Sequence, residues 1–155
     1  MCSVGSGRQA SLSWQPGSNG QVPYNAIQAG AGVFVGRSRI GADVTPGKVC
    51  SGHNVGHFPY GGKEEVCSNY EVLCDTGLHV FGPEISWISA FNGSVPPNAV
   101  VGGNTSSNEP LYICRGYVNG SMCVGKVAQS HGCSFLPHGG TEHRVPNYEV
   151  LCYSH

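Results

Sequence analysis

The hydrophobic residues of this chain fall in short runs, and glycine, proline or asparagine separates one run from the next. Four such runs in the first half read "PYNAIQAG", "GVFVGRSRI", "VTPGKVC" and "NYEVLC". They are rich in Val, Ile, Tyr and Phe, which favour strands, and none shows the 3.6-residue spacing of an amphipathic helix. The pattern predicts an all-β fold of short antiparallel strands joined by tight turns.

The chain contains two copies of one unit. "NYEVLC" occurs at 69–74 and again at 147–152, "LSWQPGSNGQVPYNAIQAG" aligns with "ISWISAFNGSVPPNAVVGG", and "VFVGRSRIGADVTPGKVCSGH" aligns with "LYICRGYVNGSMCVGKVAQSH". Extra residues within "NTSSNEP" lengthen one loop of the second copy. Such self-similarity indicates a tandem duplication. We therefore predict an N-terminal extension (1–13), a first repeat (14–77), a connector (78–86) and a second repeat (87–155). The repeats are expected to form one integrated, compact pseudo-twofold domain.

A two-residue turn is predicted at the same place in each repeat. Asn119-Gly120 suits a type I′ turn, which needs positive φ at both central residues. Gly41-Ala42 suits a type II′ turn, which needs positive φ only at the first. Both turns close a hairpin, although their types differ.

The turn fixes the register of the first hairpin. With two loop residues, Val35 lies opposite Lys48 and Arg37 lies opposite Pro46. Alternate residues share a face, so Arg37 and Lys48 are diagonal neighbours on one side of the sheet. Two cations this close repel each other unless a partner group lies between or beside them.

The composition restricts the classes of function. Charged residues make up 11% of the chain and the net charge is −1, so we expect no nucleic-acid partner. No apolar run reaches the roughly 18–20 residues of a membrane span, and the first residues lack the apolar core of a signal peptide. These patterns predict a cytoplasmic protein without a membrane span, with release by a non-conventional route as an alternative. The eight cysteines form no CxxC pair, so neither a metal nor another cofactor is expected.

Eight of the 17 charged side chains recur in register in both repeats. Pairs of this kind are Arg37/Arg115, Lys48/Lys126, Glu64/Glu142 and Glu71/Glu149. For the arginines and for Glu71 and Glu149, an internal salt bridge and a ligand role are both open. For the lysines and for Glu64 and Glu142 we favour ligand binding, because neighbouring glycines would leave space for a ligand. An internal salt bridge is the alternative.

Two aromatic pairs also recur. Trp14 and Trp87 open the repeats, and burial at the junction between repeats is favoured over stacking on a sugar ring. His53 and His131 are interpreted as structural residues, because no carboxylate at a fixed short spacing marks either as a base.

We expect no enzymatic activity. Glu64 and Glu142 could imitate the two carboxylates of a glycosidase, but they occupy equivalent places. An acid and a base need different environments, which two equivalent positions do not supply. Cys74 and Cys152 end apolar strands, where a thiol usually serves packing.

The recurring blocks "VPYNAIQAG", "TPGKV", "FPYGGKEE" and "NYEVLC", with their second copies, resemble the DM-nine repeat family from about residue 14 to the end. Members characterised as lectins are small invertebrate proteins that bind mannose and mannose-rich glycans on microbes, and some are homodimers. The resemblance implies a compact all-β unit of two interlocking repeats. It also implies a role in innate immunity, through pattern recognition or agglutination of microbes.

The resemblance also suggests binding residues. The lysine of the family's "PGK" block contacts sugar, and it corresponds to Lys48 and Lys126. The family's other sugar contact is an aspartate in the loop after "NAI-x-x-G". In this chain the first repeat has no acid there, and the second has Thr105 in its place, so Asn104 or Glu109 would have to substitute.

The leading hypothesis is a metal-independent lectin for mannose-type glycans. Its expected ligand-binding residues are Lys48, Lys126, Asn104, Thr105, Glu64 and Glu142. A lysine donor beside a glutamate or amide acceptor would hold two adjacent hydroxyls. The alternative is an intracellular protein–protein interaction module in which the repeated charges are structural.

Overall fold

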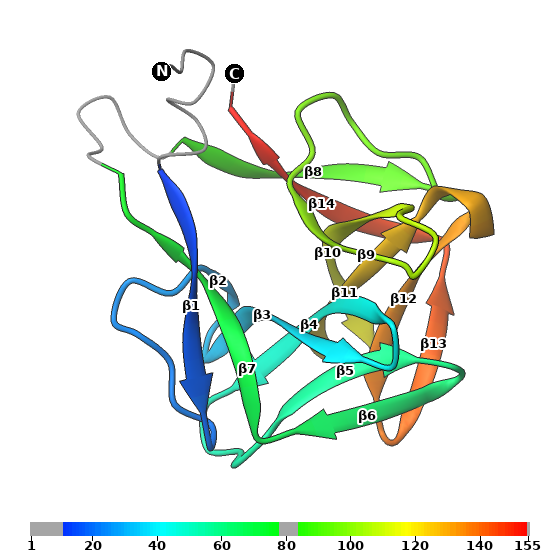
Figure 1. Cartoon of the computed structure of the whole chain (residues 1–155). Coiled ribbons are helices and arrows are strands. Elements are labelled where there is room, and N and C mark those ends of the chain that lie inside the picture. The colour runs from blue at the N-terminus through cyan, green and yellow to red at the C-terminus, as the bar shows by residue number, and fades with distance from the viewer. Residues whose placement is uncertain (1–10, 78–83, 155) are drawn as a thin grey trace.

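The computed structural model describes residues 11–77 and 84–154, and this part of the chain is built almost wholly from β-strands (Figure 1). The all-β prediction is confirmed, and the one helical element within the described residues is the single turn η1 (Gln129–His131). Residues 1–10 of the predicted extension and residues 78–83 of the predicted connector lie outside the described part.

Each repeat contributes seven strands to the described part of the chain. Those of the first repeat are β1 (Leu12–Ser18), β2 (Gln28–Gly30), β3 (Val33–Ile40), β4 (Asp43–Cys50), β5 (Gly56–Tyr60), β6 (Lys63–Cys67) and β7 (Asn69–Asp75). Those of the second are β8 (Ile85–Phe91), β9 (Val101–Asn104), β10 (Pro110–Val118), β11 (Ser121–Ala128), β12 (Cys133–His138), β13 (Thr141–Val145) and β14 (Asn147–Tyr153). Each strand of the first repeat therefore has a counterpart in the second.

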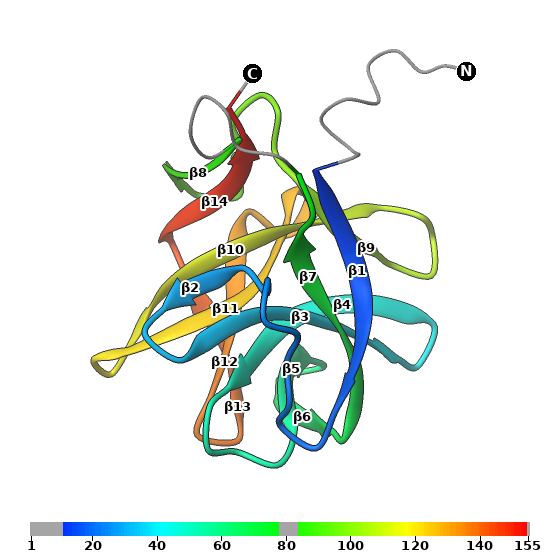
Figure 2. The ribbon, with the colours of Figure 1, turned by 90° about the vertical axis from the view of Figure 1, so that its left-hand side faces the viewer.

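The strand order is symmetric about the junction between repeats. It runs β1-β7-β3-β4-β5-β6 and continues β13-β12-β11-β10-β14-β8, so the second half reverses the first with equivalent strands exchanged. The halves join where Thr141 of β13 lies opposite Lys63 of β6. In the two perpendicular views, β4 and β5 lie close to β11 and β12 (Figures 1 and 2). This order is that of a pseudo-twofold unit.

The predicted hairpin register is observed. Val35 lies opposite Lys48 and Arg37 lies opposite Pro46. Gly41 has φ of 59° whereas Ala42 stays out of the positive-φ region, and Asn119 and Gly120 have φ of 50° and 82°. The two turns therefore differ in the way that their residues predict.

The hydrophobic core has three main parts. One cluster draws on both repeats and contains the equivalent pairs Ile27/Val100, Val35/Ile113 and Leu73/Leu151. A second cluster lies within the first repeat around Phe58, and a third lies within the second repeat around Leu136. Because the shared cluster takes side chains from both repeats, the repeats form one cooperative core.

The shared core explains which way the hairpin faces. Val35 is fully buried in the shared cluster, and Val49 is fully buried in the cluster of the first repeat. Side chains alternate between the two faces of a strand, so the face that carries Val35, Arg37 and Lys48 is turned toward the second repeat. The charged residues of each hairpin therefore reach into the opposite half.

Candidate functional site

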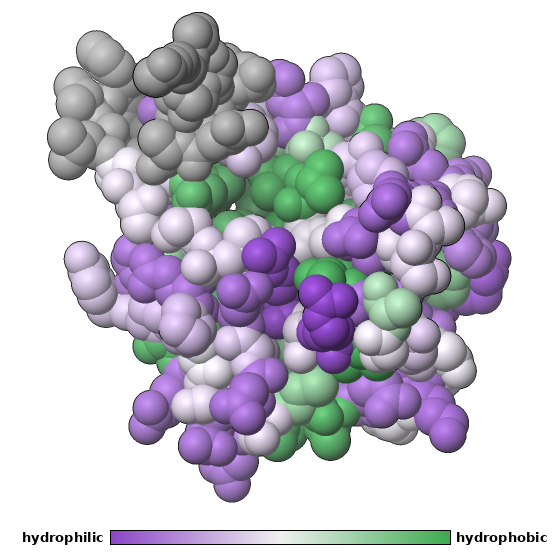
Figure 3. Space-filling model, in the orientation of Figure 1, coloured by the Kyte–Doolittle hydropathy of each residue, from purple (hydrophilic) through white to green (hydrophobic). Residues whose placement is uncertain are grey.

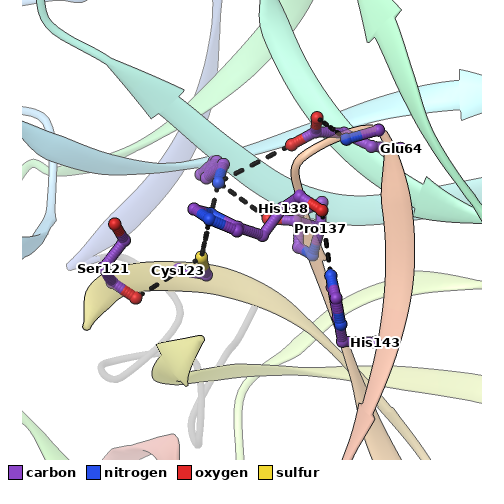
Figure 4. Close-up of polar contacts among 8 residues, drawn as sticks. Glu64, Ser121, Cys123, Pro137, His138 and His143 are labelled. Carbon is purple, nitrogen blue, oxygen red and sulfur yellow. Dashed lines mark hydrogen bonds and ion pairs between the residues drawn. The ribbon is translucent and has the colours of Figure 1, made fainter. Parts of the chain in front are cut away.

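Lys48 crosses from the first repeat into the second. Its side chain leaves β4, and Nζ donates to the carbonyl oxygen of Pro137 at 2.7 Å and to Cys123 Sγ at 3.3 Å (Figure 4). Nζ also lies 3.6 Å from Oε2 of Glu64. Only 7% of Lys48 is exposed, so its ammonium group has exchanged most of its water for protein partners.

Lys126 makes the reciprocal crossing from the second repeat into the first. Its Nζ donates to the carbonyl oxygen of Pro59 at 2.9 Å and lies 3.3 Å from Oε2 of Glu142. The same nitrogen lies 5.6 Å and 5.5 Å from the ring centroids of Tyr60 and Phe135. Lys126 is 8% exposed, so the two lysines are buried to the same degree.

The glutamates connect each lysine to the opposite repeat. Glu64 Oε1 accepts from the backbone N–H of Gly140 at 2.9 Å, and Glu142 Oε1 accepts from that of Gly62 at 2.8 Å. With Oε2 directed to the lysine, each carboxylate is engaged through both oxygens. Glu64 and Glu142 therefore orient the lysines, and each also lines the pocket beside its lysine.

Lys48, Glu64, Lys126 and Glu142 together form what we call the inter-repeat Lys–Glu network. The salt-bridge alternative for these residues is thus realised within each repeat, and the hydrogen bonds of the same residues join the repeats to each other. Buried ion pairs add little net stability compared with a well-packed apolar core, but removing one partner is costly because a charge is left uncompensated. The network therefore fixes how the two halves dock.

Each lysine nevertheless lies beside open space. A pocket of about 430 Å³, here called the Lys126 pocket, is lined by Lys126, Glu142, Asp43, Tyr60, Thr105 and Phe135, among others. A pocket of about 450 Å³, the Lys48 pocket, is lined by Lys48, Glu64, Cys50, His57, Ser121 and His138, among others. Both volumes lie in the range of small-molecule sites.

One face of the molecule has its most hydrophilic side chains gathered near the centre, beside smaller hydrophobic patches (Figure 3).

The two pockets have different walls at equivalent positions. The Lys48 pocket is lined by Cys50, His57 and His138. The residues at the equivalent positions of the Lys126 pocket are Ala128, Phe135 and Tyr60, in the same order. One wall is therefore rich in thiol and imidazole groups and the other in aromatic rings.

Burial controls the chemistry of the thiol and imidazole groups. It raises the pKa of the Cys50 and Cys123 thiols, although the nearby Lys48 ammonium opposes the rise. Burial also lowers the pKa of His57, whose Nδ1 is buried without a hydrogen-bond partner in the described part of the chain. Thiols with raised pKa are weak nucleophiles at neutral pH. The cysteines within residues 11–77 and 84–154 are all free.

Of the three loop residues suggested by the sequence, Asn104, Thr105 and Glu109, one lines the Lys126 pocket. Thr105 lines the Lys126 pocket, and its Oγ1 accepts from the backbone N–H of Glu109 at 3.1 Å. Asn104 lies in β9, where its side chain donates to the Thr105 carbonyl oxygen at 3.0 Å. Glu109 is turned to Ser130, whose hydroxyl and backbone N–H bonds lower the pKa of the glutamate. Thr105 is therefore the loop candidate that reaches the pocket.

The arginines form a second reciprocal set of contacts. Arg37 pairs with Glu71 at 2.8 Å and stacks over Trp14 at 4.2 Å. Its Nη1 donates across the junction to the carbonyl oxygen of Gly102 at 3.4 Å. Trp14 also packs against the shared core, which agrees with the predicted burial at the junction.

The second repeat repeats these contacts. Arg115 pairs with Glu149 at 2.7 Å, stacks over Trp87 at 4.6 Å and donates to the carbonyl oxygen of Ala29 at 3.0 Å. The salt-bridge interpretation of the repeated arginines is confirmed.

The glycines beside the lysines have a different role from the expected one. A Cβ at Gly47 would lie 2.4 Å from the carbonyl oxygen of His57, and one at Gly125 would lie 2.0 Å from that of Phe135. These glycines allow neighbouring strands to approach closely and leave no room for a ligand. Gly61 and Gly62 instead occupy an open turn with φ of 61° and 85°, which presents the Gly62 N–H to Glu142.

Sequence reasoning missed three contributors. The carbonyl oxygens of Pro59 and Pro137 receive the lysines, and Asp43 lines the Lys126 pocket from the opposite repeat. The two prolines stand at equivalent places, in "FP" and "LP", shortly before the "GG" turns. This recurrence was a signal in the sequence for a role of their carbonyl oxygens. Asp43 has no acidic counterpart in the second repeat, so the repeat gave no signal for it.

The fold and the network define an all-β protein of two interlocked repeats with one buried Lys–Glu pair in each. The chain belongs to the DM9 repeat family, whose repeat matches residues 28–145. The resemblance noted in the sequence is thereby confirmed.

Two relatives come from Thalassophryne nattereri. Natterin-3 is 33% identical over 95 residues, which cover 61% of this chain and 23% of that protein. Natterin-4 is 29% identical over 140 residues, which cover 86% of this chain and 32% of that protein. The chain therefore spans about a quarter to a third of the length of these relatives.

A solved structure shares the fold. The nematode sperm cell motility protein MFP2B superposes with a TM-score of 0.64 and 14% identity, covering 92% of this chain and 44% of that protein. Within residues 11–77 and 84–154, no helix has the length and apolar character to cross a membrane. The same residues hold no group of three or more His, Cys, Asp or Glu side chains suited to a metal ion.

Proposed function

We propose that this protein is a lectin that binds mannose and mannose-rich glycans without a metal ion, in pattern recognition or agglutination of microbes. The observation that carries the proposal is that each buried lysine, held in a fixed position by its glutamate and a proline carbonyl, lies beside a pocket of about 430–450 Å³. A preorganised ammonium donor loses little freedom when a hydroxyl binds, which favours affinity.

The chemistry suits a neutral sugar. Neutral sugars are held by several hydrogen bonds from groups fixed by their own neighbours, because an unpaired buried hydroxyl is costly. A single monosaccharide contact is weak, so binding to a microbial surface would depend on several sites acting together. Homodimerisation would multiply these sites further.

The proposal also includes the absence of catalysis. Glu64 and Glu142 have equivalent partners, namely a lysine and a backbone N–H of the opposite repeat. Glycoside hydrolysis by two carboxylates needs two different environments. Bound glycan should therefore be recovered unchanged.

A glycan array followed by titration calorimetry with mannosides tests the proposal. Binding should be selective for mannose-type glycans and should be the same with and without a chelator. If the wild-type chain binds no mannoside, the proposal is wrong.

One observation favours a second candidate, a protein–protein interaction module. Each lysine is held by an ion pair within its own repeat and by a hydrogen bond to a proline carbonyl of the other, so their duplication is explained without any ligand. This candidate predicts that lysine substitutions lower the stability of a chain that binds no glycan.

A further inference from the structure

The two lysines differ in how many hydrogen-bond donors they have left. An ammonium group has three N–H donors. Lys48 donates two hydrogen bonds, to the Pro137 carbonyl and to Cys123 Sγ, and its ion pair with Glu64 is longer, at 3.6 Å. Among the described residues Lys126 donates one hydrogen bond, to the Pro59 carbonyl, and forms an ion pair with Glu142 at 3.3 Å.

The cause of this difference is a single pair of equivalent positions. Thr45 occupies in the first repeat the place that Cys123 occupies in the second. Thr45 Oγ1 is buried and makes no hydrogen bond within the described part of the chain, so it takes no proton from Lys126. Among the described residues, Lys126 therefore has one more N–H without a hydrogen-bond partner than Lys48 has.

The Lys126 pocket also has a carboxylate that is only partly used. Asp43 begins β4, beside the hairpin turn of the first repeat, and its Oδ1 accepts from the backbone N–H of Ser106 at 3.0 Å. No residue within 11–77 or 84–154 donates to its Oδ2. Asp43 lines the Lys126 pocket, and the equivalent residue Ser121 lines the Lys48 pocket. A carboxylate oxygen is a stronger acceptor for a hydroxyl than another hydroxyl is.

The walls of the Lys126 pocket fit the apolar face of a sugar ring. Tyr60 and Phe135 present aromatic rings there, where the Lys48 pocket has His138 and His57. Gly41 leaves room for the Tyr60 hydroxyl, since a Cβ at that position would lie 2.9 Å from the hydroxyl oxygen. Aromatic rings of this kind bury the C–H face of a pyranose.

We propose that the Lys126 pocket is the hexose site of this chain and that Asp43 is its specificity-determining acceptor. The free N–H of Lys126 and Oδ2 of Asp43 would bind adjacent hydroxyls of one terminal hexose, with the ring against Tyr60. The site is a composite of both repeats, because Asp43 and Tyr60 belong to the first and Lys126 to the second. This inference rests on the proposed lectin function and assigns it to one of the two pockets.

Titration calorimetry with methyl α-mannoside, on the full chain and on the D43N variant, tests the assignment. The wild type should bind about one equivalent of mannoside. The amide introduced by D43N would keep an oxygen for the Ser106 N–H and turn an N–H donor to the ligand, so affinity should fall about tenfold or more. The matched control is S121A at the equivalent place in the Lys48 pocket, and its affinity should be unchanged.

A second variant, outside the turn, controls for a loss of affinity in D43N that comes from local unfolding of the turn. Y60H gives the Lys126 pocket the residue of the other pocket and should weaken binding, with an unchanged circular dichroism spectrum. Two equal sites per chain, or a D43N variant that binds as the wild type does, would overturn the assignment and leave the lectin proposal standing. A wild type that binds no mannoside would instead overturn the lectin proposal and this inference with it.

Discussion

The two repeats are alike where they hold each other and unlike where they face open space. Lys48 and Lys126 both reach a proline carbonyl of the opposite repeat and both pair with a glutamate. The pocket beside Lys48 is lined by thiol and imidazole groups, whereas that beside Lys126 is lined by aromatic rings and Asp43.

The contrast between shared contacts and differing pocket walls separates two roles that a lysine could have, namely holding the repeats together and contacting a ligand. Contacts that close the junction are needed twice, because a pseudo-twofold interface places each contact on both halves. Pocket walls are under no such constraint, so the halves can differ in the ligand they accept. The shared contacts thus hold the repeats together, and under the proposed lectin function the positions that differ would set the selectivity.

The largest expected effect comes from breaking the inter-repeat Lys–Glu network. Glu64→Ala leaves the Lys48 ammonium buried without its carboxylate and also removes the acceptor of the Gly140 N–H. We expect the free energy of unfolding to fall by about 3–5 kcal/mol. Glu142→Ala should cost a similar amount, and urea denaturation measures both.

The isosteric variant separates the charge from the hydrogen bond. Glu64→Gln can still accept from the Gly140 N–H, so it should lose less stability than Glu64→Ala. If Glu64→Ala costs under about 1 kcal/mol, in the range of exposed ion pairs, the network does not hold the repeats together.

Local rules predicted much of each hairpin. The turns at Gly41 and Asn119 set the register, and that register placed Arg37 and Lys48 on one face. The duplicated arginines pointed to salt bridges, which the structure contains. These features depend on residues close in sequence or on side-chain alternation, which the pattern of a single repeat specifies.

The docking of the repeats was beyond such rules. The lysine face meets the other repeat, so Lys48 ends against Pro137, 89 residues away. The same crossing brings Asp43 to a pocket of the second repeat. No periodicity within one repeat specifies these contacts, because they depend on how two sheets pack. For this reason the sequence did not predict that Glu64 and Glu142 also accept from backbone N–H groups of the opposite repeat.

A smaller loss of stability is expected from substitution of the two arginines, which occupy equivalent positions in the two repeats. Arg115→Ala removes an ion pair, a stack on Trp87 and a 3.0 Å bond to Ala29, and should cost about 1–2 kcal/mol. Arg37→Ala should cost less, because its bond across the junction is longer, 3.4 Å. Thermal unfolding at matched pH ranks the two. Equal losses would show that the bonds across the junction contribute nothing to the difference.

The smallest expected effect comes from giving the first repeat a residue of the second. His57 lies edge to face with His53 at 5.4 Å, and the equivalent Phe135 lies edge to face with His131 at 5.6 Å. His57→Phe therefore keeps the ring geometry and removes the buried, unpartnered Nδ1. Since a buried polar atom without a partner is destabilising, the variant should gain about 1 kcal/mol near neutral pH.

The pH dependence of that gain tests its cause. Burial, the largest influence, lowers the pKa of His57 below its ordinary value of 6.5; Lys48 and His53 lower it further, and Glu64 opposes them. As pH falls below about 6.5, the unfolded chain takes up a proton at this position before the folded chain does, so the wild type loses stability. His57→Phe removes that loss, and its advantage should grow from about pH 7.5 to about pH 5.5. Urea denaturation at the two pH values measures the change, and an advantage that shrinks toward acid pH would contradict the assignment to His57.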